Sequence, residues 1–455
     1  MKIREISNMT NQPAKIKKSI TVIGGGSVGV AAAVKLQLDG HKVRLIDRKE
    51  PGRETSYGNA GVLSDSSVYV LNNPGLLKAL PRLLLNRSNG LRYNPLFVLK
   101  RIGWVMRFLS HCRPSNARHA AVSLRSLLVL SLDQHKKWIK DADVGHLLRQ
   151  GGGWFKLFRS KESFARYSAE MSVMRDVGVK FTVFGREQIR QIEPSLAPIY
   201  YKGVLMDETC SVSSPADLTD AYLAMFVASG GAVERTSVIG LSHDDSGWQV
   251  RCENGVHQSE NVVLAAGAWS AEIAGWLGYD IPMAWERGYH LHFEFQTPDK
   301  GVSSRTNTAD PGGGDNQNKS FTKPNLSRPI LDVEGGFSVA PMLQGLRVTS
   351  GVELTDRDAP PNFEQISKSI SLASEALKLG SQVESKPWMG RRPTLVDSLP
   401  MIGAAPRHKG LWFNFGHHHI GLSMAPGSAF LLSSLINDSP PPIDPSPFQV
   451  SRFSI

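Results

Sequence analysis

The spacing of apolar positions changes twice near the start of the chain, between residues 19 and 47. A short run rich in β-branched residues, 20–23, is typical of a buried strand. After several glycines, residues 30–38 place alanine, valine and leucine on a helical face. A second apolar run, 43–46, ends in an acidic residue. The order strand, glycine turn, helix, strand predicts a βαβ unit.

The glycines of this turn follow the spacing G-x-G-x-x-G, at Gly24, Gly26 and Gly29. The first permits a tight turn, the second lets a pyrophosphate approach the backbone, and the third lets the helix pack closely on the sheet. The helix N-terminus offers unpaired N–H groups and a partial positive charge to phosphates. Asp47 follows by roughly 20 residues, where a ribose-binding carboxylate is expected. We therefore predict a dinucleotide site here, with a purely structural glycine turn as the alternative.

The acidic residue also restricts the choice of nucleotide. A carboxylate at Asp47 repels a 2′-phosphate, which favours FAD or NAD over NADP. Arg48 follows directly and weakens this discrimination, because a guanidinium attracts phosphate.

Beyond this unit, the patterns predict a loop and several helices. The loop 51–67 is rich in Gly, Ser and polar side chains, and is either a ligand-binding loop or a solvated surface loop. Residues 74–141 show helical spacing. Within 97–109, apolar residues are interleaved with Lys100, Arg101 and Arg107. This segment is either an amphipathic core helix or a helix on a membrane surface, where basic residues flank an apolar face.

The second half of the chain alternates helix and strand patterns. We predict a helix over 215–230, a β-meander over 233–265, a strand over 289–295, and helices over 363–379 and 424–436. Residues 299–328 are rich in Gly, Asn, Ser and Asp, which predicts a mobile surface loop. The first 18 residues are polar and basic, which predicts a disordered tail, 1–18. We find no apolar run near the length of a membrane span, so none is expected.

Composition narrows the functional classes. A chain of 455 residues suffices for two or three domains of ~150 residues each. The formal net charge of +11 favours contact with anionic lipid or an acidic substrate, but no recognition motif accompanies it, so nucleic acid is not expected. The three cysteines are far apart and show neither metal spacing nor a disulfide framework, which fits a reducing cytoplasmic setting.

Six separated stretches then give the chain a resemblance to a known family. In order they are VIGGGSVGVAAAVKLQLDGHKVRLID, ETSYGNAG, VVLAAGAWS, ERGYH, MGRRPTLVDSLPMIG and IDPSPFQVSRF. From about residue 19 the chain resembles the FAD-dependent D-amino-acid oxidoreductase superfamily, most nearly the bacterial D-amino-acid dehydrogenase small subunits. The resemblance implies FAD as the nucleotide. It also implies an α/β fold like that of D-amino-acid oxidase, with a Rossmann-like FAD-binding domain interleaved with an α+β substrate-binding domain.

The resemblance also implies how segments and contacts are divided. The FAD-binding domain would take 19–75, 206–280 and 381–455, and the substrate domain 76–205 and 281–380. Gly24, Gly26 and Gly29 would hold the pyrophosphate, and Asp47, with Arg48 beside it, the adenosine ribose. The other expected FAD contacts are Thr55, Ser56, Asn59, Ala60 and Gly61 in the loop, Val238 at the adenine, Ala266 and Gly267 near the ribityl chain, and Gly416, Gly421 and Leu422 at the flavin ring.

On the substrate side, the resemblance assigns Arg392 to the substrate carboxylate, with Tyr289 of ERGYH as its partner. A guanidinium binds a carboxylate through two parallel hydrogen bonds, which would fix the α-carbon over the flavin. The structural alternatives are an ion pair of Arg392, for example with Asp397, and a core position for Tyr289.

The C-terminal glycine turn departs from the family pattern G-H-G-x-x-G, because it reads GHHHIG. His418 therefore stands where a second glycine is expected, and a β-carbon there either crowds the flavin or needs an unusual backbone angle. His417 is expected near the flavin edge. Adjacent residues in a turn rarely point at one ion, so the three histidines predict no metal site.

Together these features predict hydride transfer to FAD from a D-amino acid, or from a cyclic amine such as a D-proline derivative, giving an imine and then a 2-oxo acid. We expect a quinone or other electron carrier as acceptor. The alternatives are an oxygen-using oxidase, a non-catalytic FAD-binding subunit of a larger complex, and a basic surface-binding protein without flavin. We expect a cytoplasmic protein, and the segment 96–110 fits peripheral attachment to the inner face of the membrane.

Overall fold

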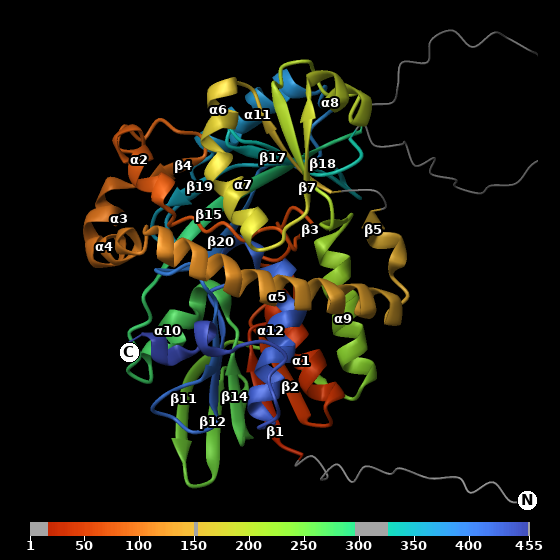
Figure 1. Cartoon of the computed structure of the whole chain (residues 1–455). Helices are drawn as coiled ribbons and strands as arrows, with labels where there is room; N and C mark the ends of the chain where they lie inside the picture. The colour runs from red at the N-terminus through yellow and green to blue at the C-terminus, as the bar shows by residue number, and fades with distance from the viewer. Residues whose placement is uncertain (1–16, 150–152, 296–325, 454–455) are drawn as a thin grey trace, which may run out of the picture.

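The computed structural model describes residues 17–149, 153–295 and 326–453. Most of the predicted tail 1–18 and of the predicted loop 299–328 lies outside the described residues. Two large sheets form the two ends of the molecule, and the long helix α5 (Pro114–Asp141) crosses between them (Figure 1). The fold is α/β, as the sequence predicts.

The smaller of these sheets has six strands in the order β10–β2–β1–β14–β22–β21. The strands are β1 (Ser19–Ile23), β2 (Lys42–Asp47), β10 (Ala232–Arg235), β14 (Asn261–Leu264), β21 (Met401–Ala404) and β22 (Leu411–Phe415). All neighbours pair in parallel except β21 and β22. Helix α1 (Ser27–Leu38) connects β1 to β2, so the predicted βαβ unit is confirmed. The sheet combines N-terminal, middle and C-terminal segments of the chain.

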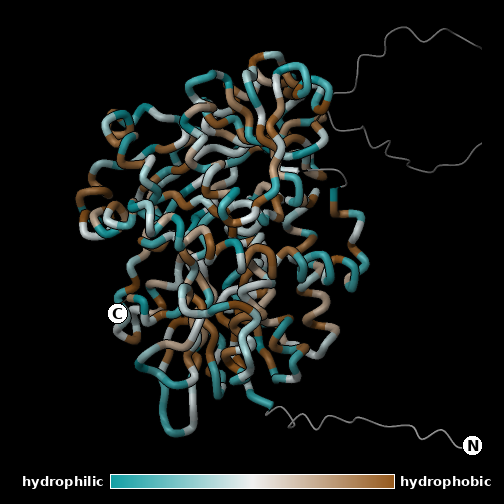
Figure 2. Tube along the Cα trace, in the orientation of Figure 1, coloured by the Kyte–Doolittle hydropathy of each residue, from teal (hydrophilic) through white to brown (hydrophobic). Residues whose placement is uncertain are grey.

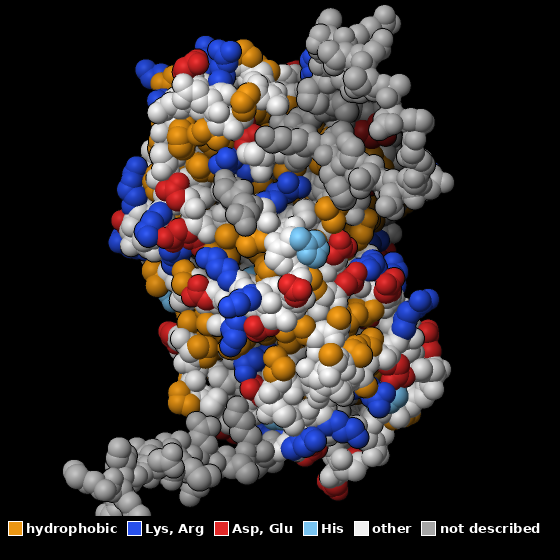
Figure 3. All heavy atoms as spheres, turned by 90° about the vertical axis from the view of Figure 1, so that its right-hand side faces the viewer, with side chains coloured by type: hydrophobic (Ala, Val, Ile, Leu, Met, Phe, Trp, Pro, Cys, Tyr) orange, Lys and Arg blue, Asp and Glu red, His pale blue; other side chains and the backbone are white. Residues whose placement is uncertain are grey.

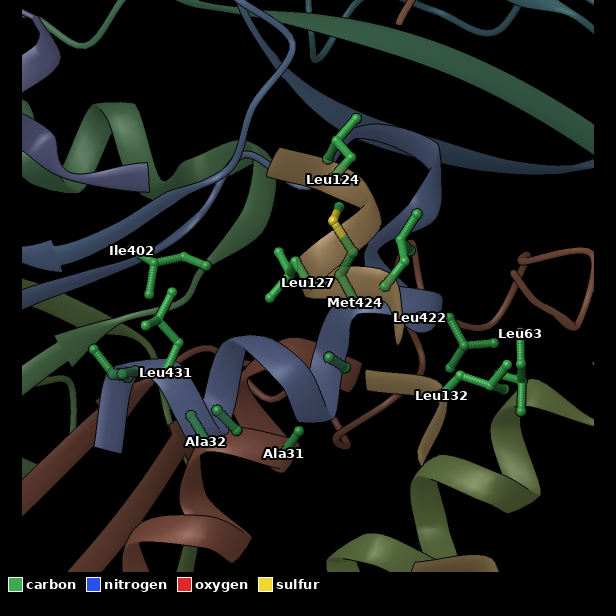
Figure 4. Packing of buried hydrophobic residues seen from close by; sticks show 14 of the residues in the cluster. Ala31, Ala32, Leu63, Leu124, Leu127, Leu132, Ile402, Leu422, Met424 and Leu431 are labelled. Carbon is green, nitrogen blue, oxygen red and sulfur yellow. The ribbon is translucent and has the colours of Figure 1, made fainter. Parts of the chain in front are cut away.

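Helix α12 (Gly421–Ile436) forms the centre of this half, between α1 and α5 (Figure 4). Ala31 and Ala32 of α1 are fully buried, and their small side chains let α12 approach closely. By length and hydropathy, the 19 residues His418–Ile436 are the one helical stretch in the described part of the chain that suffices to cross a membrane. The sequence reading predicted no such run. Because 72% of its apolar window is buried in the protein, we interpret it as a core helix.

The larger sheet has ten strands, nine of them in the order β4–β19–β15–β18–β17–β16–β6–β8–β7, with β20 paired to β15. They are β4 (Leu91–Tyr93), β6 (Trp154–Phe158), β7 (Phe181–Gly185), β8 (Lys202–Met206), β15 (Met283–Phe293), β16 (Ile330–Asp332), β17 (Phe337–Met342), β18 (Gly345–Thr349), β19 (Val352–Leu354) and β20 (Trp388–Leu395). Strand β20 belongs to this sheet although it lies within the segment 381–455 predicted for the nucleotide domain.

The structure also contains smaller elements. They are the sheet of β3 (Val62–Leu63), β5 (Leu148–Arg149) and β9 (Cys210–Val212), the meander β11 (Val238–Asp244), β12 (Gly247–Cys252) and β13 (Gly255–Ser259), and helices α6 (Lys161–Arg166), α7 (Ser168–Asp176), α8 (Arg186–Ile192), α9 (Pro215–Ala228), α10 (Ser270–Gly275) and α11 (Glu364–Ala376). The helices predicted over 215–230, 363–379 and 424–436 are confirmed as α9, α11 and α12.

Three short helices project from one side of the molecule (Figure 1): α2 (Pro74–Leu83), α3 (Pro95–Lys100) and α4 (Ile102–Ser110). The predicted helical pattern is therefore confirmed. However, α2 and α4 lie wholly within the described residues and bury none of their side chains. The interpretation of 97–109 as a core helix is thus wrong over α4, because Trp104, Val105, Phe108 and Leu109 are only half-buried and Ile102 and Met106 are exposed.

Candidate active site

A cavity of about 640 Å³ is lined by residues of both large sheets, a volume within the usual range for cofactor sites. It receives the C-terminal ends of β1 and β2, the loop 51–67, strand β20 and the turn after β22. The predicted site residues that line it are Gly24, Gly26, Asp47, Arg48, Thr55, Ser56, Asn59, Ala60, Val238, Ala266, Gly267, Arg392, Gly416, His417, Gly421 and Leu422. The structure thus brings together most of the residues that the sequence singled out, whereas Gly29, Gly61 and Tyr289 do not line the cavity.

The glycine turn has the geometry that its spacing predicts. Gly24 has a φ of +108°, and a Cβ there would lie 2.5 Å from the carbonyl oxygen of Ala265. A Cβ at Gly29 would lie 1.8 Å from the carbonyl oxygen of Gly24. The tight turn and the close helix packing are therefore confirmed. That Gly26 lies against a pyrophosphate stays a prediction.

The ends of two helices meet at this cavity and suit an anionic ligand. Neither α1 nor α12 has a cap from its own N-cap side chain or an acidic residue in its first turn, although the Ser27 N–H of α1 donates to the Ser56 hydroxyl at 2.9 Å. Gly26 precedes α1, Gly421 opens α12, and both line the cavity. Unpaired N–H groups and the positive ends of two helix dipoles attract phosphate and other electron-rich groups. The residues present therefore fit a dinucleotide.

Asp47 lies at the expected ribose position, at the end of β2. Its carboxylate accepts hydrogen bonds from the backbone N–H of Gly25 at 2.6 Å and of Lys49 at 2.8 Å. Burial raises the pKa of Asp47, while the two hydrogen bonds and the charge of Arg48 oppose this rise. Arg48 is itself held in place, 3.9 Å from the ring centre of Trp269 and 3.0 Å from Glu54. Trp269 and Glu54 also line the cavity and were not predicted as contacts.

The loop 51–67 is hydrogen-bonded to the backbone of strand β20 and of the histidine turn 417–419. The Thr55 hydroxyl donates to the carbonyl of Arg391 at 2.8 Å, and the Asn59 amide donates to the carbonyl of His419 at 3.3 Å. Gly61 has a φ of +71°, and a Cβ there would lie 2.4 Å from the carbonyl oxygen of Val212, so it serves the turn. Of the two interpretations of this loop, its position in the cavity wall favours ligand binding.

The Arg392 side chain lines the cavity and crosses the neighbouring strand β15 at Gly288, where no side chain blocks it. It pairs in register with Glu286 on β15, and a Cβ at Gly288 would lie 2.1 Å from its Nη2. No residue that the structure describes forms an ion pair with Arg392, whereas Asp397 pairs with Arg452 at 2.6 Å. The alternative of an Arg392–Asp397 ion pair is therefore wrong. Burial lowers the pKa of Arg392 and raises the pKa of Glu286, and the charge of each residue opposes the shift of the other. Because Glu286 forms no ion pair with it, the guanidinium remains available to a substrate anion.

Tyr289 is a correction to the predicted site. It is 0% exposed, and its hydroxyl donates to Glu353 at 2.5 Å and accepts from the Arg287 guanidinium at 2.8 Å. Burial, reinforced by Glu353, raises its pKa to about 12. Successive strand residues face opposite sides, and Gly288 faces Arg392, so Tyr289 faces the core of the larger sheet. The prediction that it binds substrate is wrong, and the core alternative is correct.

The histidine turn is neutral at physiological pH. His417 is buried, lies 2.9 Å from the Ser428 hydroxyl through Nε2, and burial lowers its pKa to about 3. His418 has a φ of +52°, which confirms the unusual backbone angle predicted for a side chain there. Burial lowers the pKa of His418 to about 3. His419 is surrounded by protein but exposed to the cavity, and desolvation with the charge of Arg392 lowers its pKa to about 4.

Sequence reasoning missed several residues that shape the substrate side. A Cβ at Gly58 would lie 1.9 Å from the Trp388 ring, so this indole closes over the loop. Lys156 lines the cavity and pairs with Glu170 at 2.5 Å. Trp388 and Lys156 come from two different strands of the larger sheet, β20 and β6, and no local sequence motif identifies them.

Arg347 was also missed, and it supports the loop from behind. It is buried and donates to the carbonyl of Tyr57 at 3.0 Å and to His292 Nε2 at 2.9 Å. His292 contacts Glu384 through Nδ1. His290, His292 and Glu384 are the one group in the described part of the chain with metal-ligand spacing, but the guanidinium occupies one nitrogen of His292 and opposes a cation.

Comparisons with known proteins agree with this geometry. Residues 19–435 match the family model described as FAD dependent oxidoreductase (DAO). The chain is 30% identical, over 96% of its length and 99% of the relative, to a protein named D-amino-acid oxidase from Bradyrhizobium diazoefficiens. It is 30% identical, over 94% of its length and 98% of the relative, to D-amino acid dehydrogenase 2 from Mesorhizobium japonicum.

Solved structures share the fold at lower identity. Glycine oxidase from Geobacillus kaustophilus matches with a TM-score of 0.68 at 18% identity, over 96% of this chain and 100% of that chain. L-proline dehydrogenase from P. horikoshii matches with a TM-score of 0.65 at 16% identity, over 93% of this chain and 94% of that chain. On the family match and the full-length relatives, the chain belongs to the DAO family of FAD-dependent oxidoreductases.

Proposed function

We propose that this flavin-dependent amino-acid oxidoreductase removes two electrons from the α-carbon of a D-amino acid, or of a related cyclic amine such as a D-proline derivative. The observation that carries the proposal is the Arg392 guanidinium. It lines the cavity and forms no ion pair with a described residue. A substrate carboxylate would supply the missing anion through two parallel hydrogen bonds. The names of the full-length relatives favour the D-configuration.

The chain's own residues mainly position the substrate. When bound, FAD supplies the two-electron acceptor. Arg392 anchors the carboxylate and so limits the positions open to the α-carbon. The indole of Trp388, which lies against Gly58 and Gly390, narrows the same side of the cavity. His417 and His419 are uncharged at neutral pH, so they add no competing positive charge beside the guanidinium. The imine formed from a primary D-amino acid would hydrolyse to a 2-oxo acid and ammonia, whereas the imine of a cyclic amine would keep its nitrogen.

The proposed step requires no side chain to act as an obligatory base. Hydride departure from a neutral amine needs no prior proton abstraction from carbon, so orientation and electrostatics suffice. We propose that substrate enters as the neutral amine and that activity therefore rises with pH as the substrate amine loses its proton.

For the electron acceptor, we propose a quinone or another carrier rather than oxygen. The names of the relatives divide on this point, since one is an oxidase and the other a dehydrogenase. Oxygen is therefore the second candidate. Comparing peroxide release with reduction of an artificial dye separates them. Dye reduction with little peroxide supports a carrier, whereas one peroxide per substrate oxidised overturns it.

An anaerobic screen tests the reaction itself. Purified FAD-loaded protein is mixed with D-amino acids, L-amino acids and N-alkyl amino acids, and the flavin absorbance is followed. Bleaching by D-amino acids supports the proposal. Bleaching by L-amino acids alone overturns the stereochemistry, and a yellow protein that no amine bleaches identifies a non-catalytic FAD-binding subunit.

A further inference from the structure

Helices α3 and α4 carry apolar side chains that face away from the protein. Leu96, Leu99, Ile102 and Met106 are each between 51% and 69% exposed. Hydrophobic segments are visible on these projecting helices at the left of Figure 2, outside the core of the molecule. Four large apolar side chains so exposed on neighbouring helices are unusual for a surface that meets only water.

The outward face of α4 is distinct from the face that attaches it. Trp104 donates to the carbonyl of Pro282 at 3.2 Å and stacks on Phe108, with ring centres 4.9 Å apart. At ~100° per residue, Ile102 and Met106 lie ~160° or more around the helix from Trp104. The helix is therefore already attached through one apolar face and presents a second one outward.

The segment of the chain that forms this face carries charge of a single sign. Between Asp65 and Asp133 the chain contains no Asp or Glu, and it contains ten Lys and Arg residues. Among the described residues, Arg118 and Arg125 pair with acidic groups, but no ion pair engages the Lys and Arg side chains from Lys78 to Arg113. On the face turned away from these helices, basic and acidic side chains lie interspersed (Figure 3). The helical segment that exposes the apolar residues thus carries unpaired positive charge, and the acidic residues near it, Asp280, Asp356 and Asp358, lie with Arg101 in a pocket beside α4.

We propose that the outward side chains of α3 and α4, Leu96, Leu99, Ile102 and Met106, together with Lys100 and Arg107, dock on an anionic lipid bilayer. The apolar side chains enter the interface between headgroups and acyl chains, and the basic side chains meet lipid phosphates. A bilayer suits this face because it matches both features, an apolar layer and a negative surface. In a cell this corresponds to the inner face of the cytoplasmic membrane. The inference does not depend on which amine the enzyme oxidises.

Co-sedimentation of the full-length FAD-loaded protein with vesicles tests the surface. We expect at least ~10-fold more binding to vesicles of phosphatidylcholine and phosphatidylglycerol than to phosphatidylcholine alone, with the difference lost at high salt. Leu99→Asn/Met106→Asn should reduce binding to the level of phosphatidylcholine vesicles. Lys100→Gln/Arg107→Gln should remove most of the preference for anionic lipid.

Matched controls separate the surface from general effects. Val227→Asn/Ile239→Asn changes two residues elsewhere that are each 51% exposed, and Lys368→Gln/Lys378→Gln removes two exposed charges from another region. Both controls should bind like the unchanged protein, and all variants should retain flavin absorbance. Absence of binding to anionic vesicles, or an equal loss in the controls, overturns the proposal. If the protein does not bind vesicles but forms a dimer, and Leu99→Asn/Met106→Asn dissociates that dimer, the membrane proposal is overturned and the surface instead binds a second copy of the chain.

Discussion

The two walls of the cavity are built in different ways. The nucleotide wall is mainly backbone, since Gly24 and Gly29 fix its turn and two helix N-termini open onto it. The substrate wall is mainly side chain. Arg392 and Trp388 occupy it from β20, and the glycines Gly288 and Gly58 leave them room. One wall therefore depends on a contiguous stretch of sequence, and the other depends on which residues two distant strands place opposite each other.

The largest effect is expected on the nucleotide wall, from Gly29→Val. The new side chain collides with the carbonyl of Gly24, which a Cβ alone would meet at 1.8 Å, so helix α1 cannot pack on β1. We expect protein without bound flavin, or no soluble protein, as judged by absorbance at about 450 nm, where oxidised flavins absorb. Gly103→Ala is the control, because a Cβ at Gly103 meets nothing within 4 Å, and it should retain flavin. Flavin retained by Gly29→Val would contradict the geometry of this wall.

The next effect is expected on the substrate wall, from Arg392→Ala. Loss of a charge-assisted pair of hydrogen bonds should raise KM for carboxylate substrates ~10²-fold, equivalent to ~2.7 kcal/mol. Arg392→Lys should recover part of this loss, because it keeps the charge without the paired geometry. The flavin spectrum should not change. An unchanged KM would remove Arg392 from the site.

A smaller, different effect is expected from Tyr289→Phe. Because the hydroxyl lies in the core with Glu353 and Arg287, its loss should lower the free energy of unfolding by about 1–3 kcal/mol. KM should change by less than ~2-fold, as steady-state kinetics would reveal. A rise in KM comparable to that of Arg392→Ala would place Tyr289 back on the substrate wall.

The smallest effect near neutral pH concerns the turn that contributes to both walls. Burial lowers the pKa of His417 to about 3 in the folded state, so between pH 6.5 and 3 the unfolded chain binds a proton that the folded chain does not. The contribution of this histidine to stability is therefore complete above pH 6.5 and falls by about 1.4 kcal/mol per pH unit below it. Urea unfolding at pH 7 and pH 5 should show a shallower fall for His417→Gln. An equal slope would contradict the burial of a neutral imidazole here.

The difference between the two cavity walls also explains which features of the protein could be predicted from its sequence. The βαβ unit, its glycine turn and Asp47 lie within one short segment, and each residue type has a direct physical task there. His418 shows the same advantage, because a side chain at a glycine position predicted either crowding of the flavin or an unusual backbone angle, and its φ of +52° confirms the second. The fold class followed from motifs spread over the whole chain.

Side-chain orientation on paired strands could not be predicted in this way. Gly288 and Tyr289 are adjacent in ERGYH, and only the pairing of β15 with β20 decides which one faces Arg392. Strand pairing likewise places Trp388 in the cavity wall and Arg347 behind the loop 51–67, without a local motif. The helical periodicity of 97–109 was clear, but periodicity does not say whether an apolar face has a partner, and α4 proved to be exposed.

The central claim is that FAD bound along the glycine wall is reduced by a D-amino acid anchored at Arg392. Anaerobic titration of the FAD-loaded protein with D-alanine, followed by flavin absorbance, tests it most directly. The account predicts bleaching of the unchanged protein and, at the same D-alanine concentration, little bleaching of Arg392→Ala. A flavin that stays oxidised with every D-amino acid, or equal bleaching of the two proteins at limiting substrate, would contradict it.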